Sequence, residues 1–410
     1  MQHGRVDGVE PSGPRWDLSY GFCTAILNAR RLAQLRRCGS EQRPAVCPPG
    51  SWQEFEHRLQ RSGIAVTSFA LMAAQTQNRV LVLGGTQFIG VHIVRELLKQ
   101  GYAVTLLNRG VTPSPFEGDP RVGAIRADRF EDRDAVTEAI ASEEWSGVVD
   151  TTCFDVVDAS TVVDAFTGLQ TPPRCVYIST DSVFAACERV DKKALVEADA
   201  VRATSRQAIA ELKRRDSYQY GYGSAKLDAE EVYATVDSVS LRLPDVIGPR
   251  DNLGGFLDLV DAVSRGRVGC AVKHVSDGKS HVGSIAFAPD VGRAVVAALT
   301  VSNPPKVLHI ACVRPVSVAE LAALVAGERD YALDAARKAP LLTVDIGGPL
   351  CVDAALSALD WRPTPIRGAV RETVAWYETA EHRSYTRALA AGKTPAALVE
   401  PEEPKRRRLM

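Results

Sequence analysis

The stretch that decides the fold is VLVLGGTQFIG, residues 80–90. Val80–Leu83 form an unbroken apolar run, which predicts a short buried strand. Gly84 and Gly85 follow, and a residue without a Cβ atom tolerates the positive φ angles of a tight turn. Gly90 then allows the next helix to pack closely against this turn. The stretch is typical of a strand that enters a helix through a glycine-rich turn.

A helix is expected over Phe88–Gln100, because Ile89 and Ile93 share one face and Gly101 can end it. A second strand, Ala103–Leu107, completes the unit. This order presents helix N-terminal amides to a dinucleotide pyrophosphate. The glycine spacing departs from G-x-G-x-x-G, so the alternative is an α/β turn that binds nothing. Because the turn stands between a strand and a helix, we predict a dinucleotide site.

Strands and helices alternate beyond this unit, which indicates an α/β protein. Further strands are expected at Gly123–Ile125, Gly147–Asp150, Cys175–Ser179, Ser240–Leu243 and Val307–Ile310, with helices at Asp132–Ala141, Ala159–Phe166, Tyr222–Val236 and Pro315–Val325. Apolar strands joined by helices indicate a doubly wound parallel sheet, the Rossmann fold. We predict a flexible N-terminal extension (1–77), an NAD(P)-binding Rossmann domain (78–249), a smaller mixed α/β substrate cap with returning Rossmann elements (250–380) and a C-terminal tail (381–410).

Composition excludes several classes of function. The chain has 410 residues, 45% of them hydrophobic, which is enough for a large core. Its net charge of −1 gives no general attraction to nucleic acid or to an anionic membrane. No apolar run is long enough to span a membrane. The nine cysteines form no C-x-x-C pair, so we expect free thiols in a reducing, cytoplasmic compartment, without a disulfide framework or a metal site.

Both ends of the chain differ from the middle. Residues 1–71 contain nine arginines and no lysine, and organelle transit segments are also rich in arginine. The same residues include six acidic side chains, which transit segments avoid. We favour a flexible extension before Met72 and keep organelle import as the alternative. Cys23–Leu35 can form a small amphipathic helix. The run Lys405–Arg408 is either a nuclear signal or solvated charge, and we favour solvated charge.

Polar residues follow the expected strands, where ligands bind in such sheets. Asn108 and Arg109 follow the second strand. An acidic residue there would bind the ribose 2′-hydroxyl of NAD, whereas Arg109 can pair with a 2′-phosphate, so NADP is favoured over NAD. After the third strand, Asp128 precedes Arg129, and this acid can accept a hydrogen bond from the adenine amino group. Thr151 follows the fourth strand. The alternative for Arg109 and Asp128 is an exposed loop.

A candidate catalytic group follows the fifth strand. Tyr222 and Lys226 stand four residues apart and share one helix face. A phenol ionises near pH 10, and a nearby ammonium lowers this pKa by favouring the phenolate. Thr180 can hold a substrate oxygen against the phenol. The three residues would then move a proton from an alcohol while a hydride leaves its carbon for a nicotinamide. The alternative for Tyr222 is a tyrosine of the core.

These features, in this order, are similar to the extended short-chain dehydrogenase/reductases, also called the NAD-dependent epimerase/dehydratase family. The resemblance covers residues 79–380 and rests on GGTQFIG (84–90), ADR (127–129), ISTDSVF (178–184), YGSAK (222–226), RLPDVIGPRD (242–251), IAFAPDVGRAVVAAL (285–299) and LDWRPTPIRGAVRETVAWY (359–377). It implies that Tyr222 is the catalytic acid or base, Lys226 its partner and Thr180 the hydroxyl that holds the substrate. It also implies a homodimer.

The resemblance further places Pro244 and Val246 beside the nicotinamide. The residues expected to bind the cofactor are therefore Gly84, Gly85, Thr86, Gln87, Phe88, Ile89, Gly90, Asn108, Arg109, Asp128, Arg129, Thr151, Ser179, Tyr222, Lys226, Pro244 and Val246. The expected cofactor is NAD(P), with NADP favoured.

Two departures from the family pattern bear on function. Gln87 takes the place of the family's middle glycine, which resembles an atypical branch that includes the chloroplast stem-loop-binding proteins, and these bind or act on RNA. Lys279 and His281 stand near the position where sugar epimerases carry a nucleotide-binding arginine, so a UDP-sugar substrate is not implied. We expect Lys279 to be a solvated turn residue and His281 to be structural or solvent-facing.

The sequence therefore predicts an NAD(P)-dependent epimerase, dehydratase or reductase that transfers a hydride at a hydroxyl-bearing carbon of a sugar or nucleotide-sugar. These three reactions share the hydride step, and the sequence does not separate them. The alternative is a non-catalytic dinucleotide-binding protein that associates with RNA. The near-zero net charge argues against strong RNA binding, so the expected partner is a small-molecule substrate.

Overall fold

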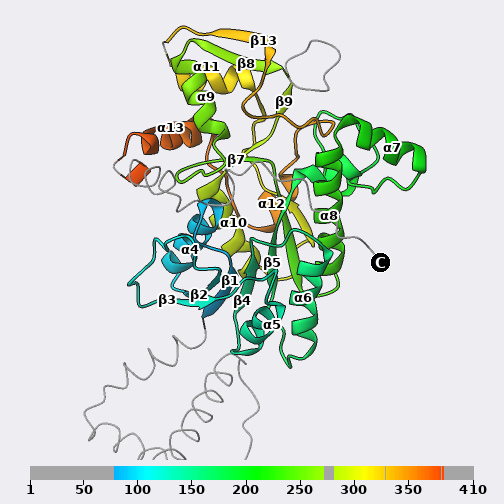
Figure 1. Ribbon diagram of the computed structural model, residues 1–410, viewed down its shortest axis with the longest axis vertical. Coiled ribbons are helices and arrows are strands. Elements are labelled where there is room, and N and C mark those ends of the chain that lie inside the picture. Colours follow the sequence, from blue (N-terminus) through cyan, green and yellow to red (C-terminus); the bar gives the residue numbers. More distant parts are fainter. Residues whose placement is uncertain (1–77, 272–280, 328, 380, 383–410) are drawn as a thin grey trace, which may run out of the picture. The chain divides into compact units, whose positions relative to one another are not determined.

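The computed structural model describes residues 78–271, 281–327, 329–379 and 381–382 (Figure 1). These residues belong to one unit of the chain, Gln77–Met410. The N-terminal extension with the helix expected over Cys23–Leu35, the basic run Lys405–Arg408 and Lys279 lie outside the described residues. No helix in the described part is long and apolar enough to cross a membrane.

A parallel sheet of seven strands forms the centre of the described unit (Figure 1). Its strands are β1 (Arg79–Leu83), β2 (Ala103–Asn108), β3 (Val122–Arg126), β4 (Gly147–Asp150), β5 (Cys175–Thr180), β6 (Ser238–Leu243) and β11 (Val307–His309). They lie in the order β11-β6-β5-β4-β1-β2-β3, and each neighbouring pair is parallel. The chain runs outward from β1 to β3 and then returns to β4 on the other side of β1. This reversal creates the crevice where open α/β sheets bind ligands, and the predicted doubly wound fold is confirmed.

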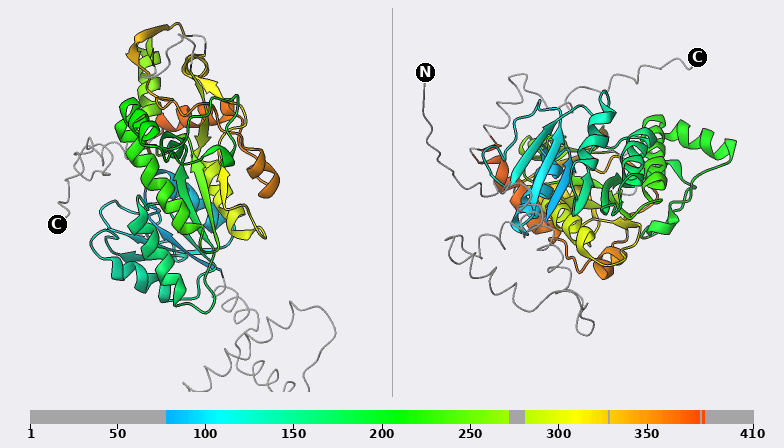
Figure 2. Two further views of the ribbon diagram at one scale, coloured as in Figure 1. Left: turned by 90° about the vertical axis from the view of Figure 1, so that its right-hand side faces the viewer. Right: turned by 90° about the horizontal axis from the view of Figure 1, so that it is seen from below.

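Helices cover both faces of the sheet (Figure 1 and Figure 2). One face is covered by α4 (Phe88–Lys99) and α10 (Ala288–Thr300), and the other by α5 (Arg133–Ala141), α6 (Val156–Thr167) and α8 (Ser217–Tyr233). Successive residues of β1 divide between the two cores. Val80 and Val82 pack on the α4 side, whereas Leu81 and Leu83 pack on the α8 side. All four are fully buried, as an enclosed strand requires.

The later part of the chain builds the cap around its own core, in which Phe256, Val316 and Leu321 are fully buried. Its elements are β7 (Asp245–Ile247), α9 (Gly255–Ser264), β8 (Arg267–Ala271), β9 (Val282–Gly283), β10 (Ile285–Phe287), β12 (Val316–Ser317), α11 (Val318–Ala326), β13 (Ala332–Lys338) and α13 (Ile366–Tyr377). Short elements complete the unit: η1 (Asp181–Ala186), η2 (Glu197–Asp199), α7 (Arg206–Arg215) and α12 (Asp353–Ala358). Both α10 and β11 return to the Rossmann layers, α10 as a covering helix and β11 as an edge strand of the central sheet.

Three helices begin elsewhere than predicted. α6 begins at Val156 and not at Ala159, because the Asp155 side chain accepts hydrogen bonds from amides of the first turn. α8 begins at Ser217, well before Tyr222, because the Asp216 side chain accepts hydrogen bonds from amides of the first turn. Tyr222 therefore lies inside the helix and not at its start. The helix expected from Pro315 begins at Val318, because the preceding residues pair with β9 and Ser317 caps the helix. In all three cases a capping side chain sets the boundary.

Candidate active site

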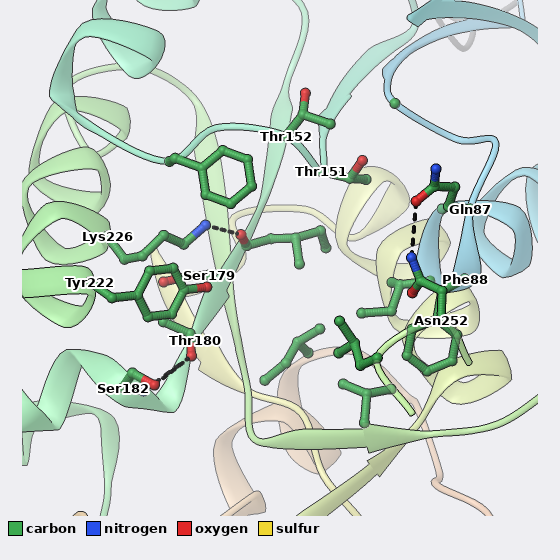
Figure 3. Close-up of a pocket in the computed structure, with 18 of the residues that line it drawn as sticks. Gln87, Phe88, Thr151, Thr152, Ser179, Thr180, Ser182, Tyr222, Lys226 and Asn252 are labelled. Carbon is green, nitrogen blue, oxygen red and sulfur yellow. Dashed lines mark hydrogen bonds between the residues drawn. The ribbon is translucent and has the colours of Figure 1, made fainter. Parts of the chain in front are cut away.

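A cavity of about 930 Å³ extends along the carboxyl ends of the central strands. Its lining comes from the turn between β1 and α4, the loops after β2, β3 and β4, the ends of β5 and β6, α8 and the cap. Every residue that the sequence predicted to bind the cofactor or to act in catalysis lines this cavity. In Figure 3, Gln87 and Phe88 from the start of α4 lie on one side of the cavity, and Tyr222 and Lys226 lie on the other side.

The glycine-rich turn fits a dinucleotide pyrophosphate. Gly84 and Gly85 have φ angles of 107° and 94°, and a Cβ atom at Gly84 would lie 2.2 Å from Thr151 Oγ1. A Cβ atom at Gly90 would lie 2.8 Å from Cα of Gly85. α4 has no acidic residue in its first turn, and Gln87 does not cap it with its side chain. The first amides of α4 therefore remain available to an anion.

The residues after β2 and β3 fit the ribose and adenine end of such a cofactor. Arg109 is exposed, and no described side chain pairs with its guanidinium. The Asn108 side chain accepts a hydrogen bond of 2.8 Å from the amide of Gly110 and so shapes this turn. Asp128 accepts one of 3.0 Å from the amide of Phe130, which leaves its second carboxylate oxygen for a ligand.

Arg129 is a predicted site residue whose guanidinium is engaged within the protein. Although the cavity touches it, this residue is 5% exposed, and its Nη1 atom lies 2.7 Å from Asp150 Oδ1. The Tyr233 hydroxyl donates to the other oxygen of Asp150 at 2.7 Å. The guanidinium thus anchors the loop after β3 to the end of β4, and its charge is paired within the protein. The sequence could not show the pairing, because it depends on the order of strands in the sheet.

Two hydroxyls predicted to bind the cofactor are also engaged within the protein. Thr151 Oγ1 donates to the carbonyl of Leu83 at 2.8 Å. Ser179 Oγ donates to Glu230 Oε1 at 2.5 Å, and Glu230 forms a buried ion pair of 2.7 Å with Arg242. Both residues line the cavity, but their hydroxyl groups donate hydrogen bonds to acceptors within the protein.

α8 brings Tyr222 to Thr180, as Figure 3 shows. A Cβ atom at Gly223 would lie 1.9 Å from the carbonyl oxygen of Ser182, so a glycine is needed for α8 to lie this close to η1. Thr180 Oγ1 accepts a hydrogen bond of 3.1 Å from the Ser182 amide and lies 3.2 Å from the Ser182 hydroxyl. Thr180 and the phenol of Tyr222 are therefore held on one side of the cavity.

Lys226 lines the cavity but is only 5% exposed. Its Nζ atom donates to the carbonyl oxygens of Cys153 at 2.9 Å and Ile178 at 2.8 Å. It also lies 4.4 Å from the centre of the Tyr177 ring, within the range of a cation–π contact. Burial lowers the pKa of Lys226 to about 8. The ammonium is thus fixed between the ends of β4 and β5.

The expectation that Lys226 lowers the pKa of Tyr222 is wrong for this structure. Burial raises the pKa of Tyr222 to about 12, and the charges of Tyr218 and Asp181 raise it as well, whereas a hydrogen bond with Thr180 lowers it. The Lys226 ammonium donates to main-chain carbonyls, and Lys226 is not among the groups that shift the pKa of Tyr222. Tyr222 is therefore a neutral phenol near pH 7.

Several cavity residues were not singled out from the sequence. Asp181 follows Thr180 directly, and Asp245 is the first residue of β7. Each stands at the carboxyl end of a central strand, and this position was the signal that could have revealed them. Asn252 also lines the cavity. His281 was expected to be structural or solvent-facing, but it is half-buried and belongs to the cavity wall.

A parallel sheet with a glycine-rich turn at its switch point and a Thr–Tyr–Lys group at its carboxyl edge defines the class of nicotinamide-dependent short-chain dehydrogenase/reductases. The sequence pattern of the NAD dependent epimerase/dehydratase family matches residues 80–311, more than half of the chain, and the chain belongs to this family.

Two relatives show which proteins the chain is similar to. It is 31% identical over 255 residues to 2′-dehydrokanamycin reductase of Streptomyces kanamyceticus, a match that covers 59% of this chain and 64% of the relative. It is 29% identical over 139 residues to chloroplast stem-loop binding protein of 41 kDa b of Arabidopsis thaliana, which covers 30% and 36% of the two chains. The chain thus matches less than two thirds of the length of either relative.

Solved structures share the fold. UDP-glucose 4-epimerase of Thermotoga maritima, solved with UDP-glucose, matches with a TM-score of 0.55 at 19% identity, over 73% of this chain and 98% of that one. dTDP-glucose 4,6-dehydratase of Bacillus anthracis, solved with NAD, matches with a TM-score of 0.56 at 17% identity, over 74% and 98%. At these identities the likeness is one of fold.

Proposed function

We propose that this protein is an NAD(P)-dependent oxidoreductase that transfers a hydride at a hydroxyl- or carbonyl-bearing carbon of a sugar or nucleotide-sugar. The observation that carries the proposal is that Thr180, Tyr222 and Lys226 line the same cavity as the glycine-rich turn. Membership of the NAD dependent epimerase/dehydratase family supports a nicotinamide cofactor.

Each side chain has a role that its surroundings support. The bound cofactor would supply or accept the hydride through its nicotinamide ring. Thr180 orients a substrate oxygen toward Tyr222, and the phenol exchanges a proton with this oxygen. Lys226 uses two of its three N–H groups on main-chain carbonyls, so the third remains for a hydroxyl of the cofactor or substrate.

Among the reactions of the family, we favour reduction of a carbonyl group. A phenol with a pKa of about 12 is protonated at neutral pH, and this is the form that donates a proton to a developing alkoxide. The opposite reaction needs a phenolate, which the buried environment of Tyr222 disfavours. The similarity to a protein named as a reductase supports the same direction.

We propose that NADP is preferred over NAD as the cofactor. Arg109 is exposed at the end of β2 without a described partner, and a guanidinium at this position can bind the 2′-phosphate in a bidentate manner. No acidic residue follows β2 directly to hold the ribose 2′-hydroxyl of NAD.

Transfer of a labelled hydride tests the proposal. The purified chain would be incubated with NADPH deuterated at nicotinamide C4 and with a set of keto-sugars, and the products would be analysed by mass spectrometry. We expect deuterium on the former carbonyl carbon of at least one product, and a rate at least 100-fold lower for Tyr222→Phe, as for loss of a general acid. The absence of deuterium transfer from both C4 epimers to any member of the set would contradict the proposal.

A second candidate is RNA association without catalysis. It is favoured by the similarity to the chloroplast stem-loop binding protein and by α7, which has no buried residue and ends in Lys213, Arg214 and Arg215. Binding of a stem-loop RNA that weakens steeply between 50 and 200 mM salt, and that is lost when these three residues are changed to alanine, would support it. Binding that is unaffected by the triple change would exclude α7 as the contact.

A further inference from the structure

Lys226 is a buried cation without an ion-pair partner among the described residues. The residue is 5% exposed, and no described carboxylate forms a salt bridge with its ammonium. Asp150 and Glu230 are the buried carboxylates whose charges act on it, but each is paired with an arginine at 2.7 Å. An ammonium is costly to bury without compensation, so other groups have to stabilise this charge.

Neutral groups surround the ammonium in place of an anion. The carbonyl oxygens of Cys153 and Ile178 accept hydrogen bonds from Nζ at 2.9 and 2.8 Å. Two aromatic rings also approach it: the distance from Nζ to the ring centre is 4.4 Å for Tyr177 and 5.9 Å for Phe154. The electron-rich face of a ring attracts a cation up to about 6 Å away, so the closer ring of Tyr177 contributes most of this attraction.

Tyr177 is held in place by its own neighbours. The residue is fully buried in β5, and its ring stacks on that of Tyr233 with 4.7 Å between the ring centres. The Tyr233 hydroxyl donates to Asp150, which fixes this second ring in turn. The Tyr177 hydroxyl, however, has no hydrogen-bond partner among the described residues. A buried hydroxyl without a partner costs stability, so what Tyr177 supplies here is its ring face.

We propose that Tyr177 is a positioning residue, whose ring face stabilises the Lys226 ammonium and leaves its third N–H for a ligand in the cavity. The proposal rests on the proposed function, in which this N–H binds a hydroxyl of the cofactor or substrate. A carboxylate in place of the ring would neutralise the ammonium and accept that N–H, whereas a ring face attracts the cation without accepting a directed hydrogen bond. Lys226 and Tyr222 lie on the same side of the cavity (Figure 3), but Tyr177 does not line it and acts through Lys226.

The ionisation of Lys226 reports this attraction. Burial lowers its pKa to about 8, so the ammonium is the major form at pH 7. Loss of the attraction by the ring would destabilise the ammonium and lower this pKa further. The titratable and charged groups around Lys226 belong to the strand ends and α8, and they are Arg129, Asp150, Cys153, Tyr177, Tyr222 and Glu230. A variant that changes only the ring of Tyr177 leaves the other charges in place.

Lysine NMR on the full chain without cofactor tests the proposal. The pKa of Lys226 would be read from the Cε signal of labelled lysine, which is assigned by its loss in Lys226→Arg. Tyr177 would be replaced by phenylalanine and by fluorinated phenylalanines with one, two and three fluorine atoms, which keep the ring outline while withdrawing electrons from its face. We expect Tyr177→Phe to leave the pKa of Lys226 unchanged, and added fluorine to lower it stepwise by about half a unit or more in total. The matched control is the same series at Tyr102, a partly buried tyrosine that packs against the core on the other face of the sheet.

The outcomes separate this proposal from the proposed function. A Lys226 pKa that does not respond to fluorine at Tyr177, or that responds equally to fluorine at Tyr102, would overturn the proposal and leave Tyr177 as a packing residue. NADPH titrations from pH 6 to pH 10 give a second readout, because affinity should fall as Lys226 loses its proton, and this fall should move to lower pH with added fluorine. A fall that stays in place while the pKa of Lys226 moves would contradict the positioning role. The absence of NADPH binding at every pH would contradict the proposed function alone, since the NMR series needs no cofactor.

Discussion

Asn252 Nδ2 lies 2.9 Å from Gln87 Oε1, and this hydrogen bond joins the cap to the glycine-rich turn before α4 (Figure 3). Gln87 Nε2 in turn donates to Thr112 Oγ1 at 2.6 Å. The three polar side chains all line the cavity and connect three separate segments of its wall. Gln87 thus replaces a glycine of the family pattern with a side chain that links the cap to the cofactor turn.

This link predicts slow release of the cofactor. Asn252→Ala removes one hydrogen bond between the cap and the turn, which is worth about 1 kcal/mol, and we expect NADPH to dissociate about fivefold faster. Stopped-flow displacement followed by NADPH fluorescence measures this rate. Gln100→Ala, which removes a hydrogen bond to Glu96 on the surface, is the control and should leave the rate unchanged. A dissociation rate for Asn252→Ala equal to that of the wild type would show that the link does not retain the cofactor.

Gly223 and Gly221 lie in the same helix, but alanine substitutions at these two positions should have opposite effects on stability. Gly223→Ala would place a methyl group 1.9 Å from the carbonyl of Ser182, so α8 must move away from η1 and carry Tyr222 with it. We expect a loss of about 2 kcal/mol in stability and a fall in kcat of at least tenfold. Gly221→Ala meets no atom within 4 Å and should stabilise the helix by about 0.5 kcal/mol with kcat unchanged. Urea unfolding and initial rates measure both, and similar behaviour of the two variants would contradict the close approach.

The exposed guanidinium of Arg109 predicts a preference for NADPH over NADH. Arg109→Ala removes the cation placed for a 2′-phosphate, so the Kd for NADPH should rise at least tenfold while the Kd for NADH changes less than twofold. Fluorescence titration gives both constants. Arg133→Ala, an exposed arginine of α5 outside the cavity lining, should change neither. Equal weakening of NADPH and NADH by Arg109→Ala would mean that this side chain does not read the 2′ position.

The raised pKa of Asp181 predicts that the variant Asp181→Asn is more stable than the wild type, and more so at high pH than at low pH. Its carboxyl has a pKa of about 8 in the folded protein against an ordinary 3.8, so the folded state keeps a proton that the unfolded chain releases. This group therefore makes the protein less stable as the pH rises from about 4 to 8. Asp181→Asn should raise the Tm by several degrees at pH 8.5 and by much less at pH 5. A Tm difference that is the same at both pH values would show that the Asp181 pKa is not raised.

The sequence was sufficient for the parallel sheet because its signals are local. The apolar run at Val80–Leu83 and the glycines after it are read along the chain without knowledge of any distant residue. The same holds for Tyr222 and Lys226, whose spacing places them on one helix face. Helix starts were less certain, because caps such as Asp216 lie outside the apolar pattern that predicts a helix.

What the sequence could not supply depends on contacts between distant residues. Arg129 is separated from Asp150 by a whole helix, and the order of the strands makes them partners. The Lys226 ammonium turns to the carbonyl of Cys153, far along the chain, so its distance from the phenol could not be derived from the helix alone. Charge partnerships are a property of the tertiary structure.

We infer that a nicotinamide cofactor binds to the glycine-rich turn and reacts beside Tyr222. The most direct measurement is the NADPH dissociation constant of the wild type and of Tyr222→Phe, determined together with the rate of deuteride transfer. We predict saturable NADPH binding with constants that agree within twofold, and a transfer rate at least 100-fold lower in the variant. No affinity of the wild type for NADPH or NADH, or an undiminished rate in Tyr222→Phe, would contradict the account.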